Sequence, residues 1–435
     1  MVSPKIRESL SPVSIPIDKC RLCQSGKFVR ILSLGNQYVS DFVTSRGGNP
    51  RSPLELVRCA NCNLVQLKHT FPRDSLYRHY WYRSGISSTM RIALEDIAVK
   101  AYSIAKPSKG DLVVDIGCND GTLLRAYKPT ELRRVGFEPA TNLVEDARRG
   151  TDYIFNDYFA FDLFRKKFAH SKAKIVTSIA MFYDLDDPAG FVTDVSKILD
   201  PQGIWVIQQN YLPTMLEQNG FDNIGHEHLT YYSLQTLSLL LREHDLEIFD
   251  VETNDVNGGS FRTYISHKDR FLVNESVSRL KDYETKLFSR RPSIYKEFEK
   301  KVRRVSLQLR GFVAKEVVDG KRVYVYGAST RGNTILQYCK LDHHLIEKAT
   351  DANPEKWGRT TPGTGIPIVP KDEARRDKPD YFLVLPHHFL DEIRRQESDY
   401  LHSGGKFIVP LPKFRIVTKD TKNLQPNLGQ FDLSS

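Results

Sequence analysis

Short apolar runs, separated by turns and helix-like stretches, fill the middle of the chain. DLVVDI (111–116) and RRVGF (133–137) are two such runs, and AKIVTSI (173–179) and GIWVIQQ (203–209) repeat the pattern further along. Runs of this length bounded by turn residues are typical of strands buried on both faces of a parallel sheet. The pattern therefore predicts an α/β domain with a mostly parallel sheet.

The last third of the chain repeats this arrangement. KRVYVYGASTRGNTILQYC (321–339) reads as a strand, a glycine turn and a helix, and YFLVLP (381–386) and KFIVPLP (406–412) complete a parallel sheet. We expect a second α/β domain here, followed by a mobile tail at about 416–435.

A basic segment at 289–311 has helical periodicity. Its apolar positions recur at steps of three and four and continue one turn further: Tyr295, Phe298, Val302, Val305, Leu309 and Phe312. This spacing predicts an amphipathic helix. The basic residues lie mostly off the apolar stripe, so we interpret them as a solvated helix face.

Size and charge narrow the classes of protein. A chain of 435 residues and 49.9 kDa is long enough for two or three domains. No stretch approaches the ~18 consecutive apolar residues of a membrane helix, and the N-terminus lacks the apolar core of a signal peptide. We expect a soluble cytoplasmic protein. A formal charge of +10 suggests an anionic partner, such as nucleic acid, a nucleotide-linked metabolite or solvent counterions.

Four of the six cysteines form two C-x-x-C pairs, Cys20 with Cys23 and Cys59 with Cys62. Two such pairs can supply four thiolates to one tetrahedral Zn²⁺ and leave no open coordination position. Nothing marks the chain as secreted, which disfavours disulfides, and neither pair opens a thioredoxin-like unit. The sequence predicts a structural zinc site.

The first strand leads into a loop that suits a nucleotide cofactor. Asp115, Gly117, Asn119 and Gly121 lie in VDIGCNDG, and Glu138 ends the second strand. The glycines allow backbone amides to approach a ligand at the start of a helix, and an acidic residue at the second strand can accept both ribose hydroxyls. NAD makes similar demands, but the loop is G-x-N-D-G and lacks G-x-G-x-x-G. We therefore predict S-adenosylmethionine, with the Asp115 carboxylate holding its amino-acid part.

Two later stretches extend this prediction. Asn156, Asp157 and Tyr158 are candidates to contact the adenine, and the loop containing Asp184 to Asp187 is either functional or a helix cap. After the fifth strand comes IGHEHLTYYS (224–233), which we place at the carboxyl edge of the sheet, where ligands of open parallel sheets bind. A metal site, a base for proton abstraction and a structural loop are the alternatives for its two histidines.

In order along the chain, these segments resemble the three-domain C-methyltransferases that act on nucleotide-linked keto-deoxysugars. Besides the cysteine pairs, the likeness rests on YWYRSGIS (80–87), VDIGCNDGTLL (114–124), GFEPA (136–140), FDNIGHEHLTYYS (221–233), NGGSFR (257–262), YGASTRGNT (326–334) and PEKWGRTTPGTGIPI (354–368). The resemblance implies a zinc-binding domain (1–75), a class I S-adenosylmethionine methyltransferase domain with a Rossmann-like fold (76–272) and a Rossmann-like substrate-binding domain (273–415).

The resemblance also implies that His228 is the general base, supported by Glu227. Many relatives carry an aromatic residue at the position of Gly225, so Tyr80 or Tyr82 is a candidate to supply a hydroxyl group instead. Chemistry points the same way, because the carbon beside a ketone becomes a nucleophile only after it loses a proton, and imidazole is a suitable base near neutral pH. His226 is the alternative base, and no metal is required.

The C-terminal glycine turn is a candidate diphosphate site. Helix-start amides together with Arg331 suit a diphosphate, and PEKWGRTTPGTG adds two further cations in a turn-rich loop. A turn without a ligand is the alternative interpretation. The predicted substrate-binding residues are Gly327, Ser329, Arg331, Asn333, Lys356 and Arg359.

Two rival functions remain at the level of sequence. The first is a nucleic-acid methyltransferase whose cysteine module grips RNA or DNA, although no asparagine-proline-proline-tyrosine loop is present. The second is an inert protein that binds sugar nucleotides, against which stand the intact Asp115, Gly117, Glu138 and His228. We expect a sugar-nucleotide substrate, no membrane or nucleic-acid partner, and a monomer.

Overall fold

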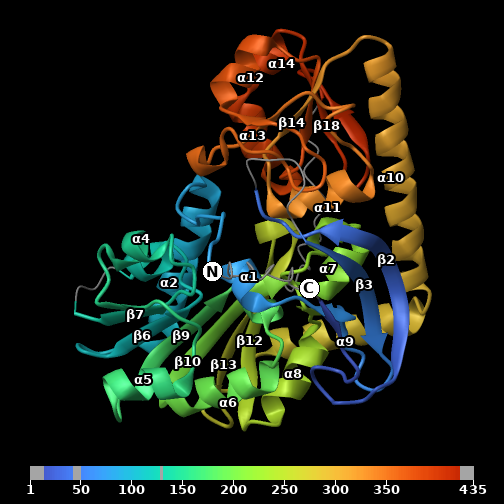
Figure 1. Cartoon of the computed structure of the whole chain (residues 1–435). Helices are drawn as coiled ribbons and strands as arrows, with labels where there is room; N and C mark the ends of the chain where they lie inside the picture. The colour runs from blue at the N-terminus through green and yellow to red at the C-terminus, as the bar shows by residue number, and fades with distance from the viewer. Residues whose placement is uncertain (1–13, 43–49, 128–130, 422–435) are drawn as a thin grey trace, which may run out of the picture.

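The computed structural model describes residues 14–42, 50–127 and 131–421. Three parts pack around a common centre (Figure 1): an N-terminal sheet module, a central α/β domain and a C-terminal α/β domain. The long helix α10 (Ile294–Val318) runs along one side of the molecule, from the N-terminal module to the C-terminal domain.

The central domain holds a seven-stranded sheet in the order β12-β13-β10-β9-β6-β7-β8. Its strands are β6 (Leu112–Ile116), β7 (Arg133–Phe137), β8 (Tyr153–Phe155), β9 (Ala173–Ile179), β10 (Leu199–Asn210), β12 (Leu246–Asn254) and β13 (Ser260–His267). The first five are parallel to one another, whereas β13 is antiparallel to both β10 and β12. The predicted parallel strands are confirmed.

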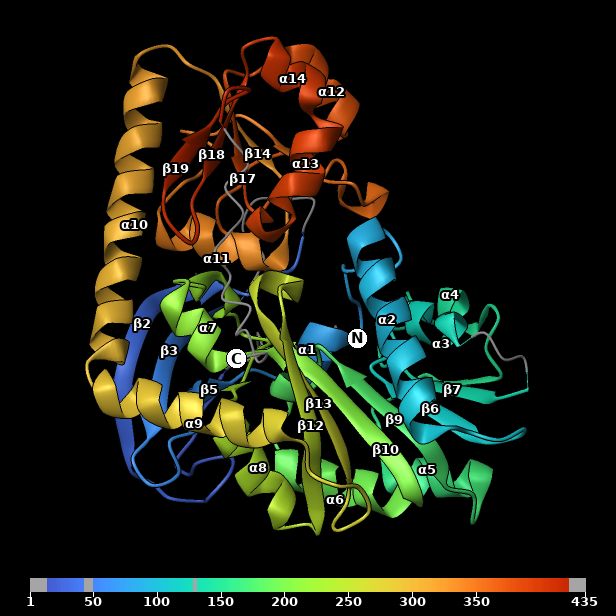
Figure 2. The ribbon, with the colours of Figure 1, turned by 180° about the vertical axis from the view of Figure 1, so that it is seen from behind.

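The chain order of these strands creates a place for a ligand. After β6 the chain builds outward through β7 and β8, then returns to the other side of β6 with β9 and β10. In open parallel sheets, ligands bind beyond the carboxyl ends of the strands where the order reverses in this way. Figure 2 shows this sheet from behind, with α2 across it.

Helices cover both faces of the central sheet. They are α2 (Ser88–Ala105), α3 (Thr122–Ala126), α4 (Val144–Arg148), α5 (Phe161–Phe168), α6 (Pro188–Ile198) and α8 (Leu234–Arg242). Helix α7 (Leu212–Glu217), which follows β10, packs against α10 instead. Three short 3₁₀ turns, η1 (Phe182–Asp184), η2 (Phe221–Asn223) and η3 (Val256–Gly258), lie in the loops of this domain.

The N-terminal module is an antiparallel sheet, and one of its strands comes from the central domain. Its own elements are β1 (Ile15–Pro16), β2 (Phe28–Tyr38), β3 (Arg51–Cys59), β4 (Val65–Leu67), β5 (His69–Thr70) and α1 (Arg73–Tyr77). In the order β11-β4-β3-β2, the outer strand β11 (Thr230–Tyr231) comes from the end of the HEHLTYY segment. The module therefore fixes the backbone immediately after His228.

The C-terminal domain has a six-stranded sheet in the order β16-β15-β14-β17-β18-β19. Its elements are β14 (Val323–Tyr326), β15 (Ala349–Thr350), β16 (Ile368–Val369), β17 (Tyr381–Val384), β18 (Lys406–Val409), β19 (Arg415–Val417), α11 (Thr330–Tyr338), α12 (Lys371–Asp377), α13 (Leu390–Gln396), α14 (Ser398–His402), η4 (Pro354–Lys356) and η5 (His387–Phe389).

The prediction of an all-parallel sheet ending at residue 415 is wrong. Strand β19 is antiparallel to β18, pairing Phe407 with Val417, so the ordered domain continues into the segment predicted as a tail. The sequence RIV is too short for its periodicity to reveal a strand. Residues 422–435 of the predicted tail lie outside the described part of the chain.

The predicted basic helix at 289–311 is present, but a break near Pro292 divides the segment. Helix α9 (Glu275–Arg290) ends before it and α10 begins after it, because proline cannot donate the backbone hydrogen bond of a continuous helix. The predicted apolar stripe is confirmed at Phe298, Val302 and Leu309, which are fully buried.

One hydrophobic core joins the three parts. It contains Leu32 of the N-terminal module, Phe221 of the central domain, Phe298 of α10 and Leu383 of the C-terminal domain. Since these residues pack in one cluster, the parts are held in fixed relative positions around the central sheet's carboxyl edge. Among the described residues, no helix combines the length and the apolar character that crossing a membrane requires.

Candidate active site

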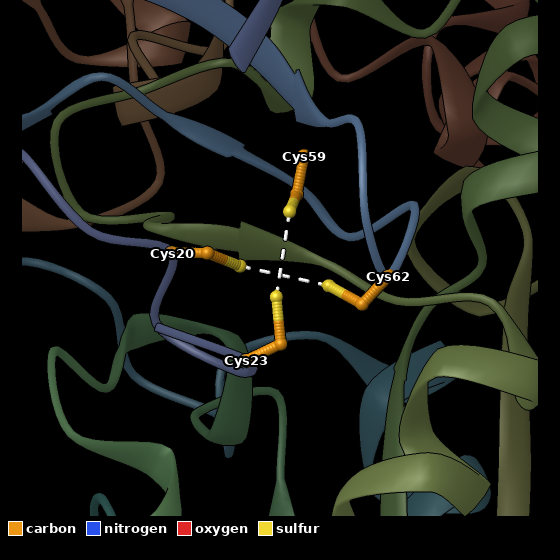
Figure 3. Close-up of side chains that lie close together, drawn as sticks. All are labelled: Cys20, Cys23, Cys59 and Cys62. Carbon is orange, nitrogen blue, oxygen red and sulfur yellow. Dashed lines mark hydrogen bonds between the residues drawn. The ribbon is translucent and has the colours of Figure 1, made fainter. Parts of the chain in front are cut away.

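The four cysteines of the two C-x-x-C pairs meet at one point (Figure 3), and their sulfur atoms all lie within 4.8 Å of one another. The Sγ atoms of Cys20 and Cys62 are 3.6 Å apart, and those of Cys23 and Cys59 are 3.5 Å apart. Thiolates about 2.3 Å from a tetrahedral zinc ion form edges of about 3.8 Å, so the cluster fits zinc closely. The site is a structural zinc centre with four protein ligands.

Arg21, between the first two cysteines, ties this centre to the central domain. Its buried guanidinium donates hydrogen bonds to the Leu67 carbonyl at 2.8 Å and the Thr70 hydroxyl at 2.7 Å, and it pairs with Asp186 at 3.1 Å. Asp186 lies in the loop after β9. The zinc module is therefore fastened to a loop at the carboxyl edge of the central sheet.

A cavity of about 790 Å³ opens at that edge. Residues from all three parts line it: Tyr77, Tyr80 and Tyr82 from the N-terminal side, Asp115, Gly117, Asn119, Glu138, Asp157, Tyr158, Asp184, His226, Glu227 and His228 from the central domain, and Ser329, Arg331 and His388 from the C-terminal domain. This size and mixed lining suit a small-molecule site that receives two ligands.

The glycine loop after β6 forms one end of the cavity. Gly117 has a φ of +75°, and a Cβ there would lie 3.0 Å from the Met181 side chain, so only glycine fits without strain. Glu138 accepts hydrogen bonds from the amides of Asn119 at 2.7 Å and Ala140 at 2.8 Å. The carboxylate therefore shapes the loop and still has lone pairs for a ligand hydroxyl.

Two carboxyl groups stand buried at this end. Asp115 accepts a hydrogen bond from Thr177 at 2.6 Å. Burial raises the pKa of Asp115 to about 7, and burial also raises the pKa of Glu138 to about 7. A cationic ligand that also offers hydroxyl groups would restore their charged forms, and S-adenosylmethionine has both an ammonium and a sulfonium group.

The remaining predicted cofactor residues occupy different positions. Gly121 and Asn156 do not line the cavity. Gly121 instead starts α3 with a φ of +77°, and the Asn156 side chain donates to the Glu138 carbonyl at 2.9 Å. Asp157 and Tyr158 do line it, and Tyr158 is held between Arg73 and Arg78. Asn156 thus supports the end of β7 from outside the cavity.

His228 is positioned by the backbone. Its Nδ1 lies 2.6 Å from the carbonyl oxygen of Asn223, and its ring contacts Tyr183 edge to face at 4.5 Å between centroids. A carbonyl only accepts hydrogen bonds, so Nδ1 carries the proton and Nε2 carries the lone pair. Burial lowers the pKa of His228 to about 4, which keeps the imidazole neutral at physiological pH.

His226 and Glu227, which precede His228 in the chain, contact other parts of the protein. His226 has its Nε2 3.0 Å from the Ser52 carbonyl of the N-terminal module, and burial lowers its pKa to about 4. Burial raises the pKa of Glu227 to about 7, and its backbone carbonyl accepts from the Tyr77 hydroxyl at 2.8 Å. The expected orientation of His228 by the Glu227 carboxylate is replaced by one from the Asn223 carbonyl. His226 and Glu227 lie in a turn, in which the His228 amide donates to the Gly225 carbonyl at 3.1 Å.

The candidate tyrosines lie beside this segment. Tyr80 and Tyr82 both line the cavity, and the Tyr82 carbonyl accepts from the Asn119 side chain at 3.0 Å. Burial raises the pKa of Tyr80 well above its ordinary value, with the carboxyl of Glu227 as a further cause. At neutral pH these hydroxyl groups remain protonated and can donate hydrogen bonds.

Arg331 reaches across from the C-terminal domain. Its guanidinium pairs with the buried Asp222 of η2 at 2.6 Å and donates to the Asn257 carbonyl at 2.7 Å. Ser329 caps α11 by accepting from the Gly332 amide at 3.0 Å. Both residues line the cavity.

Four other predicted substrate residues lie outside the cavity. Lys356 is buried, pairs with Asp351 of its own domain and lies over the Phe42 ring of the N-terminal module. Arg359 donates to the Phe42 carbonyl, so both cations contact the protein. Gly327 packs against a proline, and the side chain of Asn333 is buried in α11. A turn-rich basic loop looks the same in sequence whether its cations face a ligand or the protein.

Several lining residues were not among the predicted site residues. They are Tyr77, Asp184, Asn210 and His388. Asp222, which pairs with Arg331, was not predicted either. Asp184 lay in a segment with a recognised alternative role as a helix cap. The cap is in fact Asp187, which accepts from the Gly190 amide at 3.0 Å, and this leaves Asp184 to face the cavity.

The parallel sheet, the G-x-N-D-G loop in place of G-x-G-x-x-G and the acidic residue at the end of the second strand together fit an S-adenosylmethionine-dependent methyltransferase. The comparisons agree: the sequence matches the models of a zinc binding domain over residues 20–77, a methyltransferase domain over 89–251 and a C-methyltransferase C-terminal domain over 255–412. The C-methyltransferase NovU of Streptomyces niveus is 33% identical over 420 residues, which cover 93% of this chain and 98% of that protein. The chain belongs to this family of C-methyltransferases with an N-terminal zinc-binding domain.

Solved structures also resemble part of the chain. An S-adenosylmethionine-dependent methyltransferase of Clostridium acetobutylicum is 10% identical, with 41% of this chain and 92% of that chain covered and a TM-score of 0.33. The mitomycin 7-O-methyltransferase MmcR is 17% identical, with 41% and 54% covered and a TM-score of 0.33.

Proposed function

We propose that this C-methyltransferase methylates a carbon beside the ketone of a nucleotide-linked keto-deoxysugar, with His228 as the general base. The observation that carries the proposal is the 2.6 Å contact between Nδ1 of His228 and the Asn223 carbonyl, in a cavity that also holds the cofactor loop. This contact fixes the tautomer with a basic Nε2. A proton acceptor beside a methyl donor is what carbon methylation requires.

The cofactor end is proposed to hold S-adenosylmethionine through Asp115 and Glu138. When bound there, it supplies an electrophilic methyl group. Asp115 would hold the ammonium group, and Glu138 the ribose hydroxyls. The loop that carries Gly117 can present its backbone to the ligand, because glycine has no side chain.

His228 and its neighbours carry out the proton chemistry. Nε2 of His228 takes the proton from the carbon beside the ketone, and the electron pair moves toward the ketone oxygen. The low pKa of His228 makes it a weak base, so the reaction depends on groups that stabilise the negative oxygen. Tyr80 and Tyr82 are candidates for this role because they line the cavity as hydroxyl donors.

The C-terminal end is proposed to hold the nucleotide part of the substrate. The start of α11, with Ser329 and Arg331, lines the cavity and suits an anionic diphosphate. His388 lies beside them, and its Nδ1 is buried and makes no hydrogen bond within the described part of the chain. Part of the Arg331 charge is neutralised by Asp222, so the helix start and His388 gain importance for anion binding.

One screen tests this function. The purified zinc-loaded protein is incubated with S-adenosylmethionine and a panel of nucleoside diphosphate-linked 4-keto-deoxysugars, and the products are analysed by mass spectrometry. We expect one sugar to gain a methyl group on carbon, located by NMR. Methylation of oxygen only, or of no keto sugar while a polynucleotide is methylated, would overturn the proposal.

A further inference from the structure

The side of the cavity next to His228 carries two carboxyl groups among several tyrosines. Asp184 and Glu227 both line the cavity together with Tyr77, Tyr80 and Tyr183. A base alone leaves negative charge on the ketone oxygen, and the low pKa of His228 makes that charge hard to form without a partner acid.

The backbone brings these groups together. Asp184 ends the 3₁₀ turn η1, and the carbonyl of its neighbour Tyr183 accepts from the Leu229 amide at 2.9 Å and from the Thr230 hydroxyl at 3.1 Å. On the other side, the Tyr77 hydroxyl holds the Glu227 carbonyl at 2.8 Å. Asp184 is therefore fixed directly beside the segment that carries the base.

One carboxyl oxygen of Asp184 can act on a ligand. Its Oδ1 is buried, yet no described residue gives it a hydrogen bond. The two acidic residues that follow have structural partners, because Asp186 pairs with Arg21 and Asp187 caps α6. A buried carboxyl oxygen without a partner is costly, so its position in a cavity points to a polar atom of a ligand.

We infer that Asp184, in its protonated form, is the acid that donates a hydrogen bond and then a proton to the ketone oxygen of the substrate. This inference rests on the proposed function, because it assigns the oxygen that faces Asp184 to the substrate's ketone. Glu227 is the neighbouring carboxyl group on the segment that carries the base.

The charge environment supports a protonated Asp184. Burial raises the pKa of Asp184 well above its ordinary value, the negative charge of Glu227 raises it further, and the nearby Tyr77 hydroxyl acts in the opposite direction. The phenols that face it come from separate elements, namely Tyr77 of α1, Tyr80 of the next loop, Tyr183 of η1 and Tyr231 of β11. Each has a raised pKa, so at neutral pH none adds a negative charge.

The proton balance closes within the site. Nε2 of His228 takes the proton from carbon, the C–H electron pair forms the carbon–carbon double bond of an enol, and the proton of Asp184 passes to the oxygen. The enol carbon then takes the methyl group, and the S–CH₃ bond breaks with its electron pair left on sulfur. As the carbonyl forms again, the oxygen returns its proton to Asp184, and the substrate proton stays on His228 until it leaves to solvent.

The test compares Asp184→Asn with the parent enzyme and with Asp162→Asn, which removes an exposed carboxylate on α5 that pairs with Arg165. The amide keeps the size of the side chain but has no acidic proton. With the keto sugar that the parent methylates, we expect Asp184→Asn to lose roughly 10²-fold or more in kcat, with unchanged affinity for S-adenosylmethionine. Asp162→Asn should match the parent.

The pH profile and an infrared spectrum complete the test. The parent should lose kcat as the pH rises through the pKa of Asp184, and Asp184→Asn should lack this alkaline limb. Well above pH 7 the carboxyls with a pKa of about 7 are ionised, so the difference between the spectra of the parent and Asp184→Asn should contain one protonated-carboxyl band.

The outcomes distinguish a failure of the proposed function from a failure of the role assigned to Asp184. If the parent methylates no keto sugar, the proposed function is wrong. If the parent is active and Asp184→Asn keeps its rate and its alkaline limb, Asp184 is not the acid. Should Asp184→Asn fail to fold, the parent spectrum decides, because a parent without a protonated-carboxyl band above pH 7 contradicts the inference.

Discussion

At the scale of single residues, burial determines the chemistry of the cavity. The same desolvation raises the pKa of the carboxyls Asp115 and Glu138 and lowers that of His228. Neutral forms of all three are therefore stabilised by burial in the cavity. A cationic ligand favours the ionised forms of the two carboxyl groups instead.

Glu138 should account for much of the cofactor affinity. In Glu138→Ala, the loss of hydrogen bonds to a charged group, at about 1.5–3 kcal/mol, should weaken S-adenosylmethionine binding by roughly 10- to 100-fold. Calorimetry measures this, and Glu145→Ala, which removes an exposed carboxylate on α4, is the matched control. Equal affinity of Glu138→Ala and the parent would show that this carboxylate does not hold the cofactor.

The affinity for S-adenosylmethionine should also depend on pH. Both carboxyls have a pKa of about 7 in the free protein, and the cation favours their ionised forms. Protonation competes as the pH falls, so the Kd should rise about tenfold between pH 8 and pH 6 for each coupled carboxyl. Glu138→Gln should show a shallower slope, whereas a Kd that is constant from pH 8 to pH 6 would contradict the assignment.

Functional residues at strand ends could be predicted from the sequence, whereas contacts made by residues in loops could not. Asp115, Gly117 and Glu138 were found because a strand and a turn fix where such residues point. Lys356 and Arg359 lie in an irregular loop, where only the fold decides that they contact Asp351 and Phe42. For the same reason, the Asn223 carbonyl could not be recognised as the partner of His228.

At the scale of elements, the site depends on short segments fixed at both ends. The HEHLTYY segment follows η2 and includes β11 near its end, and β11 pairs with β4 of the zinc module. Such pairing between distant parts of the chain has no local sequence signal, so the sequence predicted the segment's place above the sheet without its attachment to the module.

The loop after β9 carries acidic residues with different roles: Asp187 caps α6, whereas Asp184 lines the cavity. Removing the cap in Asp187→Ala should lower the free energy of unfolding by about 1 kcal/mol, because the Gly190 amide loses its acceptor. Urea unfolding measures this change. The protonated-carboxyl band assigned to Asp184 should persist in this variant, and its loss would mean that the two acids had been assigned the wrong way round.

The zinc centre should hold the N-terminal module together. Metal analysis of protein purified without added metal should find about one zinc per chain, because four thiolates close a tetrahedral site. Cys20→Ser/Cys59→Ser should lose this zinc, and Cys339→Ala, which removes a buried thiol far along the chain, should retain it. A native, folded protein without metal would contradict the structural role.

At the scale of the whole molecule, the cavity exists because three parts share one core. The order of the parts could be predicted from the succession of motifs along the chain. Their packing could not, because it rests on contacts between distant residues such as Arg331 and Asp222. This ion pair links the substrate end of the cavity to the turn whose Asn223 carbonyl orients His228.

Breaking that pair should loosen the assembly. Arg331→Ala leaves the carboxylate of Asp222, whose side chain is 1% exposed, without its charge partner, at a cost of about 3–5 kcal/mol. Urea unfolding should show the loss, and Arg331→Met/Asp222→Leu should recover part of it because no buried charge remains. If Arg331→Ala is as stable as the parent, the pair does not join the domains.

The most direct test of the account is proton exchange at the substrate carbon. With the accepted keto sugar in heavy water and no methyl donor, the parent should replace the hydrogen beside the ketone with deuterium, observed by NMR. His228→Ala should keep its fold and its affinity for S-adenosylmethionine but lose this exchange and ~10²–10⁴ of the methylation rate. His226→Ala should retain more of both, since its ring contacts the Ser52 carbonyl. Exchange and methylation by His228→Ala at parental rates would contradict the account.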